Sequence, residues 1–349
     1  MNAHLFCDVL ATALTPSSPR LPRLPSFRFS LSKRKLPEIS NSLPASLLSM
    51  PVIHDRYRVV GELSETLYGW VYACEDLQRG VGSVLPSTSA AAVVVKQISL
   101  DCAASLRRAQ PAHNHVPDDP LREKEVGELI RSTGGHPNLV QYHDAFVEQD
   151  SMYLVMEYCA GGDLYDYLST RRQRTLSCLN ALSVLSQVAS GVAFLHEHGI
   201  AHRDISLENI MLHRGRCKLG DFGLATRETG AGGRRVGKKY YMAPEVVAGS
   251  TYDPKAADVW SLGIVFFIMV TGSPLVPLAC MSVKSFRTLK QTGPRAILAS
   301  WGMAQIMSES AQHLLAGMLE VNAQKRLTIQ QVLRHDALSE WLDAATASA

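Results

Sequence analysis

Four polar side chains stand in short segments whose residue types could serve chemistry on an anionic ligand. Lys96 lies in an apolar run, Asp204 and Asn209 flank a short polar stretch, and Asp221 begins Asp-Phe-Gly. Carboxylate and amide oxygens are the hard donors that suit Mg²⁺. An ammonium group supplies a compact positive charge. Together these groups could hold a metal-bound triphosphate.

The motifs around these residues follow one another in a fixed order. They are His202-Arg-Asp204 with Asn209, then Asp221-Phe-Gly223, Ala243-Pro-Glu245 and Asp258-Val-Trp-Ser-Leu-Gly263. With Lys96 upstream, this ordered set resembles the eukaryotic protein kinases over about residues 57–341. Each motif alone is weakly specific, but five in this order and rough spacing are not expected by chance.

The resemblance implies a role for each of the four side chains. Lys96 would pair with the α- and β-phosphates of ATP, and Asn209 and Asp221 would bind Mg²⁺. Asp204 would be the catalytic base that accepts or orients the substrate hydroxyl. Such catalysis consists mostly of positioning and charge neutralisation, which explains why these residue types are needed.

A helix glutamate should hold Lys96 in this family, and three glutamates compete for the role. They are Glu123, Glu125 and Glu128. We expect Glu125, because apolar residues follow it in the family's pattern before a His-Pro-Asn turn. The other two glutamates would then be solvated helix charges.

The resemblance also implies an adenine site around a hinge. Met156 stands at the gatekeeper position, and Glu157 and Cys159 would bind adenine through backbone groups. Asp163 would face the ribose or a basic substrate residue. The apolar side chains expected to sandwich the ring are Val71, Val94 and Met211, although each could equally be an ordinary core residue.

The glycine-rich loop departs from the family. Only its third glycine, Gly69, is present, and Ser64 and Thr66 stand where the first two belong. Side chains at these positions restrict close approach of the backbone to phosphate, so ATP affinity could fall. The two hydroxyl groups could compensate in part as donors.

Two further departures suggest an exchange of positions. Ser206 stands where the serine/threonine kinases usually have the catalytic-loop lysine, and Lys238 stands where they usually have a threonine. We expect Lys238 to supply a catalytic ammonium near Asp204 and the γ-phosphate, with Ser206 supplying the hydroxyl. The alternative is that both are surface residues of a weakened enzyme.

The segment from Asp221 to Glu245 predicts activity without phosphorylation. Its usual phosphosite region holds Arg234 and Arg235, whose positive charges would repel Arg203 rather than bridge to it through a phosphate, and Thr229 is the fallback site. Two structural roles also follow from the resemblance. Glu245 would pair with Arg326, and Asp258 would anchor the backbone of the catalytic loop.

The surrounding patterns predict the elements that position these residues. Strands are expected at 57–63, 68–72 and 91–98 and two more within 140–158, with polar loops at 80–90 and 101–119. Helices are expected at 121–131, 176–198, 258–270 and 308–319. A strand-rich part therefore precedes a helical part.

Composition excludes several classes of protein. Of 349 residues, 46% are hydrophobic and 19% are charged, which is enough to bury a core. A net charge of +3 gives no reason to expect nucleic acid as a partner. The seven cysteines form no C-x-x-C pair, which disfavours a zinc ribbon or disulfide framework. The longest apolar run, 262–270, is too short to span a bilayer and suits a buried helix.

Residues 1–50 are rich in Ser, Pro and Arg and are expected to form a disordered leader. An organelle transit peptide is an alternative, and a start at Met50 is another. Otherwise we expect a cytoplasmic monomer.

The sequence thus predicts an α+β, two-lobed protein-kinase-like fold with ATP between the lobes. The N-lobe would span 57–158, the C-lobe 159–341, and a short tail 342–349. The expected function is transfer of the γ-phosphoryl group of Mg-ATP to Ser or Thr hydroxyls of protein substrates. The alternatives are a pseudokinase scaffold that binds nucleotide or partner proteins, and a small-molecule kinase of related fold, which Ala243-Pro-Glu245 argues against.

Overall fold

A computed structural model describes residues 51–79, 92–109, 118–227 and 235–347. The chain divides into two compact units. The smaller unit takes the described residues up to Leu100 together with Asp144–Tyr158, and the larger takes Asp101–His143 and the residues from Cys159 onward. The leader 1–50 and the loop 80–90 lie outside the described residues.

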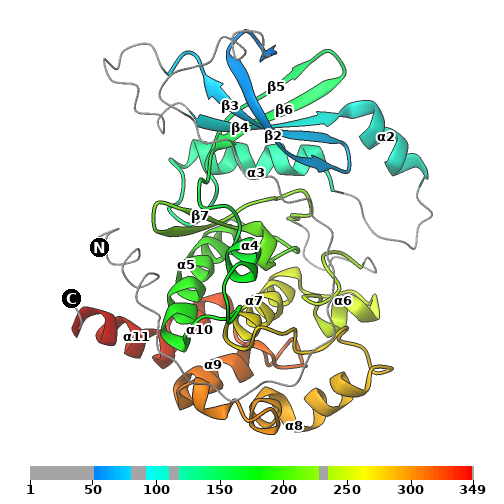
Figure 1. Cartoon of the computed structure of the whole chain (residues 1–349). Coiled ribbons are helices and arrows are strands. Elements are labelled where there is room, and N and C mark those ends of the chain that lie inside the picture. The colour runs from blue at the N-terminus through cyan, green and yellow to red at the C-terminus, as the bar shows by residue number, and fades with distance from the viewer. Residues whose placement is uncertain (1–50, 80–91, 110–117, 228–234, 348–349) are drawn as a thin grey trace. The chain divides into compact units, whose positions relative to one another are not determined.

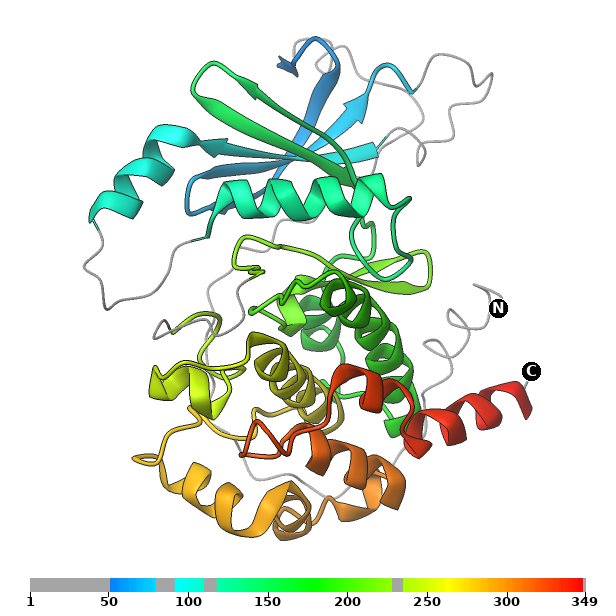
Figure 2. The ribbon, with the colours of Figure 1, turned by 180° about the vertical axis from the view of Figure 1, so that it is seen from behind.

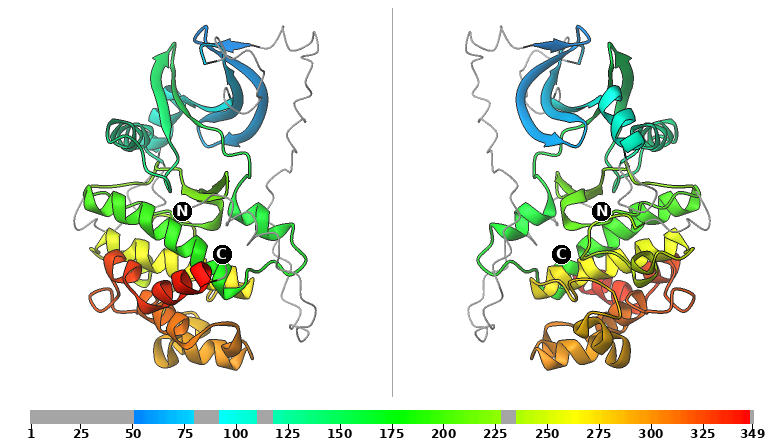
Figure 3. Two further views of the ribbon diagram at one scale, coloured as in Figure 1. Left: turned by 90° about the vertical axis from the view of Figure 1, so that its left-hand side faces the viewer. Right: turned by 90° about the vertical axis from the view of Figure 1, so that its right-hand side faces the viewer.

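The smaller unit is built on a six-stranded sheet in the order β1-β2-β3-β4-β6-β5. Its strands are β1 (Val52–Ile53), β2 (Tyr57–Thr66), β3 (Gly69–Asp76), β4 (Ala92–Ser99), β5 (Tyr142–Glu148) and β6 (Ser151–Glu157). The pairings β1–β2, β2–β3, β3–β4 and β4–β6 are all antiparallel. The β2–β3 hairpin is strongly curled and carries two register irregularities, which is the usual effect of bulges (Figure 3).

One face of this sheet carries an apolar core. Side chains alternate between faces along a strand, and directly paired residues share a face. The buried cluster is made of Tyr57, Val59, Cys74, Val93, Val95 and Val155. Val94 and Lys96 alternate with Val93 and Val95, so they lie on the opposite face.

The larger unit is mainly helical (Figure 1). Its helices are α2 (Leu100–Ala109), α3 (Pro120–Ser132), α4 (Leu164–Ser169), α5 (Cys178–Glu197), α6 (Pro244–Ala248), α7 (Pro254–Thr271), α8 (Lys284–Ser300), α9 (Glu309–Met318), α10 (Ile329–Leu333) and α11 (Asp336–Ala347). Two short 3₁₀ helices, η2 (Leu207–Asn209) and η3 (Ala304–Ile306), accompany them, with a hairpin of β7 (Ile210–His213) and β8 (Arg216–Leu219).

Helices α5 and α7 form the centre of the larger unit (Figure 2). Each begins with a side-chain cap: Ser177 accepts from the Asn180 N–H, and Asp253 accepts from the Lys255 N–H. Gly272 ends α7 with φ of 72°, a conformation that favours glycine. Both helices are long and apolar enough to span a membrane. However, 67% of the most apolar stretch of α5 and 83% of that of α7 are buried inside the fold. The expectation of a buried helix around 262–270 is confirmed.

The α+β class and the order of strands before helices are confirmed. One expected loop is wrong in its first half, because Leu100–Ala109 forms α2. The boundary of the units also differs from the expected lobes, since Asp101–His143 groups with the helical unit. Helix α11 runs through residue 341 into the expected tail.

Candidate active site

The loop from His202 to Asn209 is fixed to the core of the larger unit by Asp258. This carboxylate is fully buried and accepts from the backbone N–H groups of His202 at 2.8 Å and Arg203 at 2.7 Å. It also lies 2.8 Å from Nε2 of His196. Arg203 has φ of 66°, which a side-chain-bearing residue rarely adopts, so these bonds hold a strained turn just before Asp204.

The ring of His202 bridges the two polar segments. Its Nε2 lies 3.1 Å from the Gly220 carbonyl, and its Nδ1 accepts from the Asp204 N–H at 3.2 Å. This pattern fits a neutral ring that carries its proton on Nε2. Phe222 is buried against this ring, with centroids 5.3 Å apart. The turn that carries Asp204 is therefore joined to the one that carries Asp221.

Asp204 receives several donors. The Nδ2 group of Asn209 donates to both the Asp204 backbone oxygen and its Oδ2 atom, each at 2.8 Å. Lys238 donates from its backbone N–H to Oδ1 at 3.2 Å and from Nζ to Oδ2 at 2.8 Å. The carboxylate is 12% exposed, so it is held firmly while still reaching solvent.

Lys238 contacts three of the residues singled out from the sequence. Besides Asp204, its Nζ donates to Ser206 Oγ at 3.0 Å and to Asn209 Oδ1 at 3.4 Å. Burial lowers the pKa of this ammonium, but attraction to Asp204 and the hydrogen bond with it outweigh that effect, and the pKa is raised overall. The side chain is thus a cation at neutral pH.

Asn209 and Asp221 lie at one end of the β7–β8 hairpin. The Ile210↔Leu219 pair closes this end, and the Gly220 N–H donates to the Asn209 carbonyl at 2.9 Å. The amide nitrogen of Asn209 is engaged by Asp204, and its Oδ1, which also accepts from Lys238 Nζ at 3.4 Å, is the oxygen that it can offer to a metal ion. Asp221 is exposed and offers carboxylate oxygens. This donor set suits Mg²⁺.

The smaller unit gathers the other predicted ligands on one face of its sheet. Val71 pairs with Lys96, and Val94 pairs with Met156, so these four side chains share that face. Glu157 is the last residue of β6 and pairs with Val93 on the other face. The face carries one ammonium among half-buried apolar groups, which is the pattern expected for a purine with phosphates.

Gly69 closes the β2–β3 hairpin where the glycine-rich loop was expected. A Cβ atom here would lie 2.5 Å from the Gln97 carbonyl oxygen, so no other residue fits without a backbone shift. Ser64 and Thr66 pair with Val71 and Gly69 within the ladder. The two positions without the family's glycines therefore belong to strand β2, and one of its register irregularities lies between Glu62 and Ser64.

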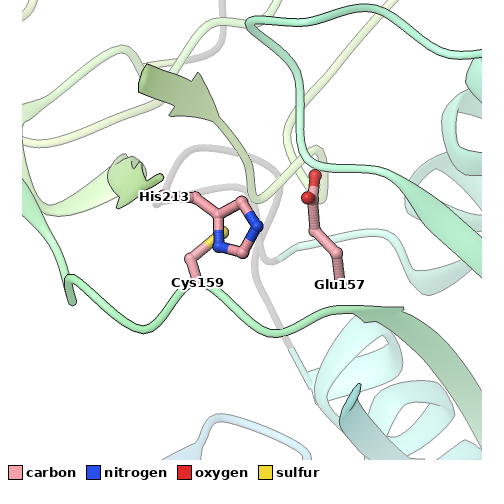
Figure 4. Close-up of side chains that lie close together, drawn as sticks. All are labelled: Glu157, Cys159 and His213. Atoms are coloured by element: carbon pink, nitrogen blue, oxygen red, sulfur yellow. The ribbon is translucent and has the colours of Figure 1, made fainter. Parts of the chain in front are cut away.

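The residues from Cys159 to Asp163 run along β7 in the larger unit. Gly161 donates to the Leu212 carbonyl at 2.9 Å, and Asp163 forms a β-bridge with Met211. Cys159 is buried, and its Sγ lies within 4.8 Å of a ring nitrogen of His213. Figure 4 shows these two side chains next to each other. Cys159, Asp163 and Met211 are thus brought to one edge of the hairpin.

Asp163 has a structural task in addition to its expected role. Its carboxylate caps α4 by accepting from the Asp166 N–H at 2.7 Å. Burial raises the pKa of this carboxyl, and neighbouring carboxylates add to the rise.

The structure gives the candidate glutamates Glu125 and Glu123 very different surroundings. Its side chain is 54% exposed and pairs on the surface with Arg122. Glu123 is only 2% exposed and accepts from the hydroxyl group of Tyr142 at 3.0 Å. Position 123 lies on the buried stripe of α3 with Pro120, Val126, Gly127 and Ile130, so helical periodicity could have identified it.

The two structural roles expected from the sequence have matching contacts. Arg326 forms a two-pronged pair with Glu245, at 2.6 and 3.0 Å, and its side chain is fully buried. It also donates to the carbonyls of Ala256 and Glu320. Its guanidinium group lies 5.2 Å from the ring centroid of Trp260.

Known proteins resemble this chain over more than half of its length. A probable serine/threonine-protein kinase, HSL1 of Saccharomyces cerevisiae, is 29% identical over 264 residues, which are 74% of this chain and 16% of that protein. Serine/threonine-protein kinase PLK4 of Drosophila grimshawi is 34% identical over 210 residues, 59% of this chain and 26% of that protein. CBL-interacting serine/threonine-protein kinase 17 of Arabidopsis thaliana is 32% identical over 207 residues, 58% and 46% respectively.

The chain spans less than half the length of each of these relatives. The description of the family that matches residues 81–338 is "protein kinase domain". That match covers most of the chain and includes the sequence from Val94 to Arg326 that carries the motifs. The chain therefore belongs to the protein kinase family.

Proposed function

We propose that this protein transfers the γ-phosphoryl group of Mg-ATP to Ser or Thr hydroxyls of protein substrates. The observation that carries the proposal is Asp204, a carboxylate 12% exposed and bonded to both Asn209 and Lys238. A carboxylate fixed in this way can orient and accept a proton from a hydroxyl group. All three relatives are named as serine/threonine-protein kinases, which supports Ser and Thr as acceptors.

The reaction forms one bond and breaks another at phosphorus. The substrate hydroxyl oxygen bonds to the γ-phosphorus, and the bond from that phosphorus to the oxygen bridging the β-phosphate breaks. The electron pair of the broken bond leaves with ADP. The hydroxyl proton passes to Asp204 and from there to solvent, so the charges balance.

Asn209 and Asp221 are the proposed ligands of Mg²⁺. Oδ1 of Asn209 faces the same cluster as Asp204, and Asp221 adds to the attraction that raises the pKa of Lys238. When bound, Mg²⁺ neutralises charge on the phosphates. Phe222, buried against His202, keeps Asp221 at the end of the hairpin.

The sheet of the smaller unit is the proposed nucleotide platform. Lys96 would bind phosphate oxygens, and Val71 and Val94 on the same face would contact the adenine ring. Within α3 we propose Glu123, in place of Glu125, as the family's helix glutamate, because its carboxylate is the buried one.

The test is phosphoryl transfer by the full chain. Wild-type protein, treated with phosphatase and then freed of it, is incubated with Mg²⁺, radiolabelled ATP and a generic basic protein. We expect label on Ser and Thr, about a thousandfold less with Asp204→Asn, and a similar loss with Lys96→Met. ATP should still raise the melting temperature of Asp204→Asn.

Two results would separate this proposal from its alternatives. Binding of ATP without transfer by the wild-type protein would indicate a pseudokinase scaffold. Label confined to Tyr would contradict the choice of acceptor. The phosphatase treatment also tests the expectation that phosphorylation of residues 221–245 is not needed.

A further inference from the structure

The ammonium group of Lys238 occupies the centre of the proposed catalytic cluster. Its Nζ lies 2.8 Å from Asp204 Oδ2, 3.0 Å from Ser206 Oγ and 3.4 Å from Asn209 Oδ1. These three partners all come from the loop after α5, whereas Lys238 comes from the segment between Asp221 and Glu245. The cation is therefore brought to the loop from a distant part of the chain.

The surroundings of Ser206 explain why a lysine fits from this direction. Ser206 is fully buried, and its hydroxyl group receives the Lys238 ammonium. A short side chain leaves room for the incoming Nζ, which a second long side chain at this position would fill. The two residues are thus complementary in size as well as in hydrogen bonding.

The backbone of the segment that carries Lys238 also packs closely against the loop after α5. Gly237 has φ of +87°, and a Cβ atom there would lie 2.7 Å from the Arg203 carbonyl oxygen and 3.3 Å from Asp204 Oδ1. The next N–H, that of Lys238, donates to the same Oδ1 atom at 3.2 Å. Only glycine allows this approach, so the position of Lys238 depends on close contact between the segment and the loop.

The ammonium of Lys238 has partners besides Asp204, because its three N–H donors also reach Ser206 and Asn209. The side chain is 38% exposed, and its longest bond, 3.4 Å to Asn209 Oδ1, is the one that an incoming phosphate oxygen would replace. The γ-phosphoryl group carries negative charge toward the hydroxyl that Asp204 orients. A cation bonded to that carboxylate is well placed to stabilise the phosphoryl group as it passes between ATP and substrate.

We propose that Lys238 is a catalytic residue that contacts the transferred phosphoryl group. We propose also that the segment around Gly237, which packs against Arg203, positions this side chain. The catalytic cation then belongs to a different segment from the catalytic loop, so the site is complete only while Gly237 is packed against Arg203. This inference rests on the proposed phosphoryl transfer and adds to it a source of charge and a means of control.

The first experiment compares two adjacent lysines. Lys238→Met should lower kcat by about a hundredfold to a thousandfold, with a smaller change in the KM for ATP, because the charge acts mainly in the transition state. Lys239→Met is the matched control, since Lys239 is exposed and its neighbour carries the contacts. It should keep kcat within about twofold, as expected for a surface change away from the chemistry.

A second variant moves the cation. Lys238→Thr combined with Ser206→Lys places an ammonium on the loop and a hydroxyl on the segment, so the same groups meet from opposite sides. We expect this double variant to recover about tenfold or more of the kcat lost by Lys238→Thr alone, because the charge returns to one place. A purely structural Lys238 would give no recovery of kcat, even if the melting temperature were restored.

A third variant tests whether the segment around Gly237 positions Lys238. Gly237→Ala leaves Lys238 in the chain but pushes the segment away from Arg203. Its kcat should fall about as far as that of Lys238→Met, and combining the two changes should cost little more, because both remove the same contact. Melting temperature in the presence of ATP shows that each variant is folded.

The outcomes distinguish this inference from the proposed function. Active wild-type protein with fully active Lys238→Met would overturn the role of Lys238 and leave the kinase proposal intact. If the wild-type protein is active but the losses of kcat in Gly237→Ala and Lys238→Met add up in the double variant, the segment around Gly237 does not act by positioning Lys238. Wild-type protein that transfers no phosphate would overturn both proposals.

Discussion

Replacing Asp258 should damage both stability and catalysis, because this carboxylate holds the catalytic loop from within the core. It is fully buried and accepts from two backbone N–H groups, those of His202 and Arg203. In Asp258→Ala, both groups lose their acceptor, at about 1–3 kcal/mol each. His196 loses its partner as well. We expect a total near 4 kcal/mol.

This loss should lower the melting temperature by roughly 10 °C for a domain of this size. Arg203 would also relax from its positive φ, and Asp204 follows it directly in the chain. A shift of about 1 Å at a reacting group can cost about a hundredfold in rate, so kcat should fall by that order.

The assay is thermal unfolding followed by circular dichroism, with phosphoryl transfer measured well below the transition. Asp253→Ala is the matched control, because Asp253 caps the same helix from an exposed position. It should lose only about 1 kcal/mol, with kcat unchanged. If Asp258→Ala melts no lower than Asp253→Ala and keeps its kcat, the anchoring role assigned to Asp258 is refuted.

Three further predictions follow from single contacts. Glu123→Gln should lower kcat/KM by about a hundredfold, whereas the exposed Glu125→Gln should change it by less than about twofold, as steady-state kinetics would reveal; equal losses would contradict our assignment. Arg326→Met leaves the Glu245 carboxylate, which is only 14% exposed, without its partner and should cost about 3–5 kcal/mol by urea unfolding; a cost below about 1 kcal/mol would contradict a strong pair. Burial raises the pKa of the Asp76 carboxyl, but its hydrogen bond with Arg56 outweighs burial and holds this pKa below the ordinary 3.8. The stability that Asp76 contributes is therefore fully present above pH 3.8 and is lost as the pH falls through the lower, folded-state pKa. In Arg56→Met, this part of the acid-dependent loss should disappear from unfolding curves measured across this range.

Much of the site was accessible from the sequence because its chemistry is written in short motifs. Asp204, Asn209 and Asp221 were identified by residue type and order, and the larger unit does bring Asp204 and Asn209 into contact. The strand that carries Lys96 was also predicted, since its apolar, β-branched run is a local pattern. These features need only neighbouring residues to be recognised.

Other features depended on which residues meet across long stretches of chain. Glu123 and Glu125 are two positions apart, and only the packing of α3 distinguishes the buried one from the exposed one. Helix α2 was missed because its residues, which include the good helix formers Ala and Leu, were grouped with the polar stretch that follows them up to residue 119.

The sequence by itself determined the inventory of this protein: its fold class, its motifs and the charged groups available for catalysis. Only the tertiary structure decided which oxygen atoms the ammonium of Lys238 reaches and why Gly237 must be glycine. The physical reason is that hydrogen bonds act over about 3 Å, while the partners are separated by 29 to 34 residues of chain. Spacing in the sequence cannot fix such a distance, because it is set by the packing of every element between them.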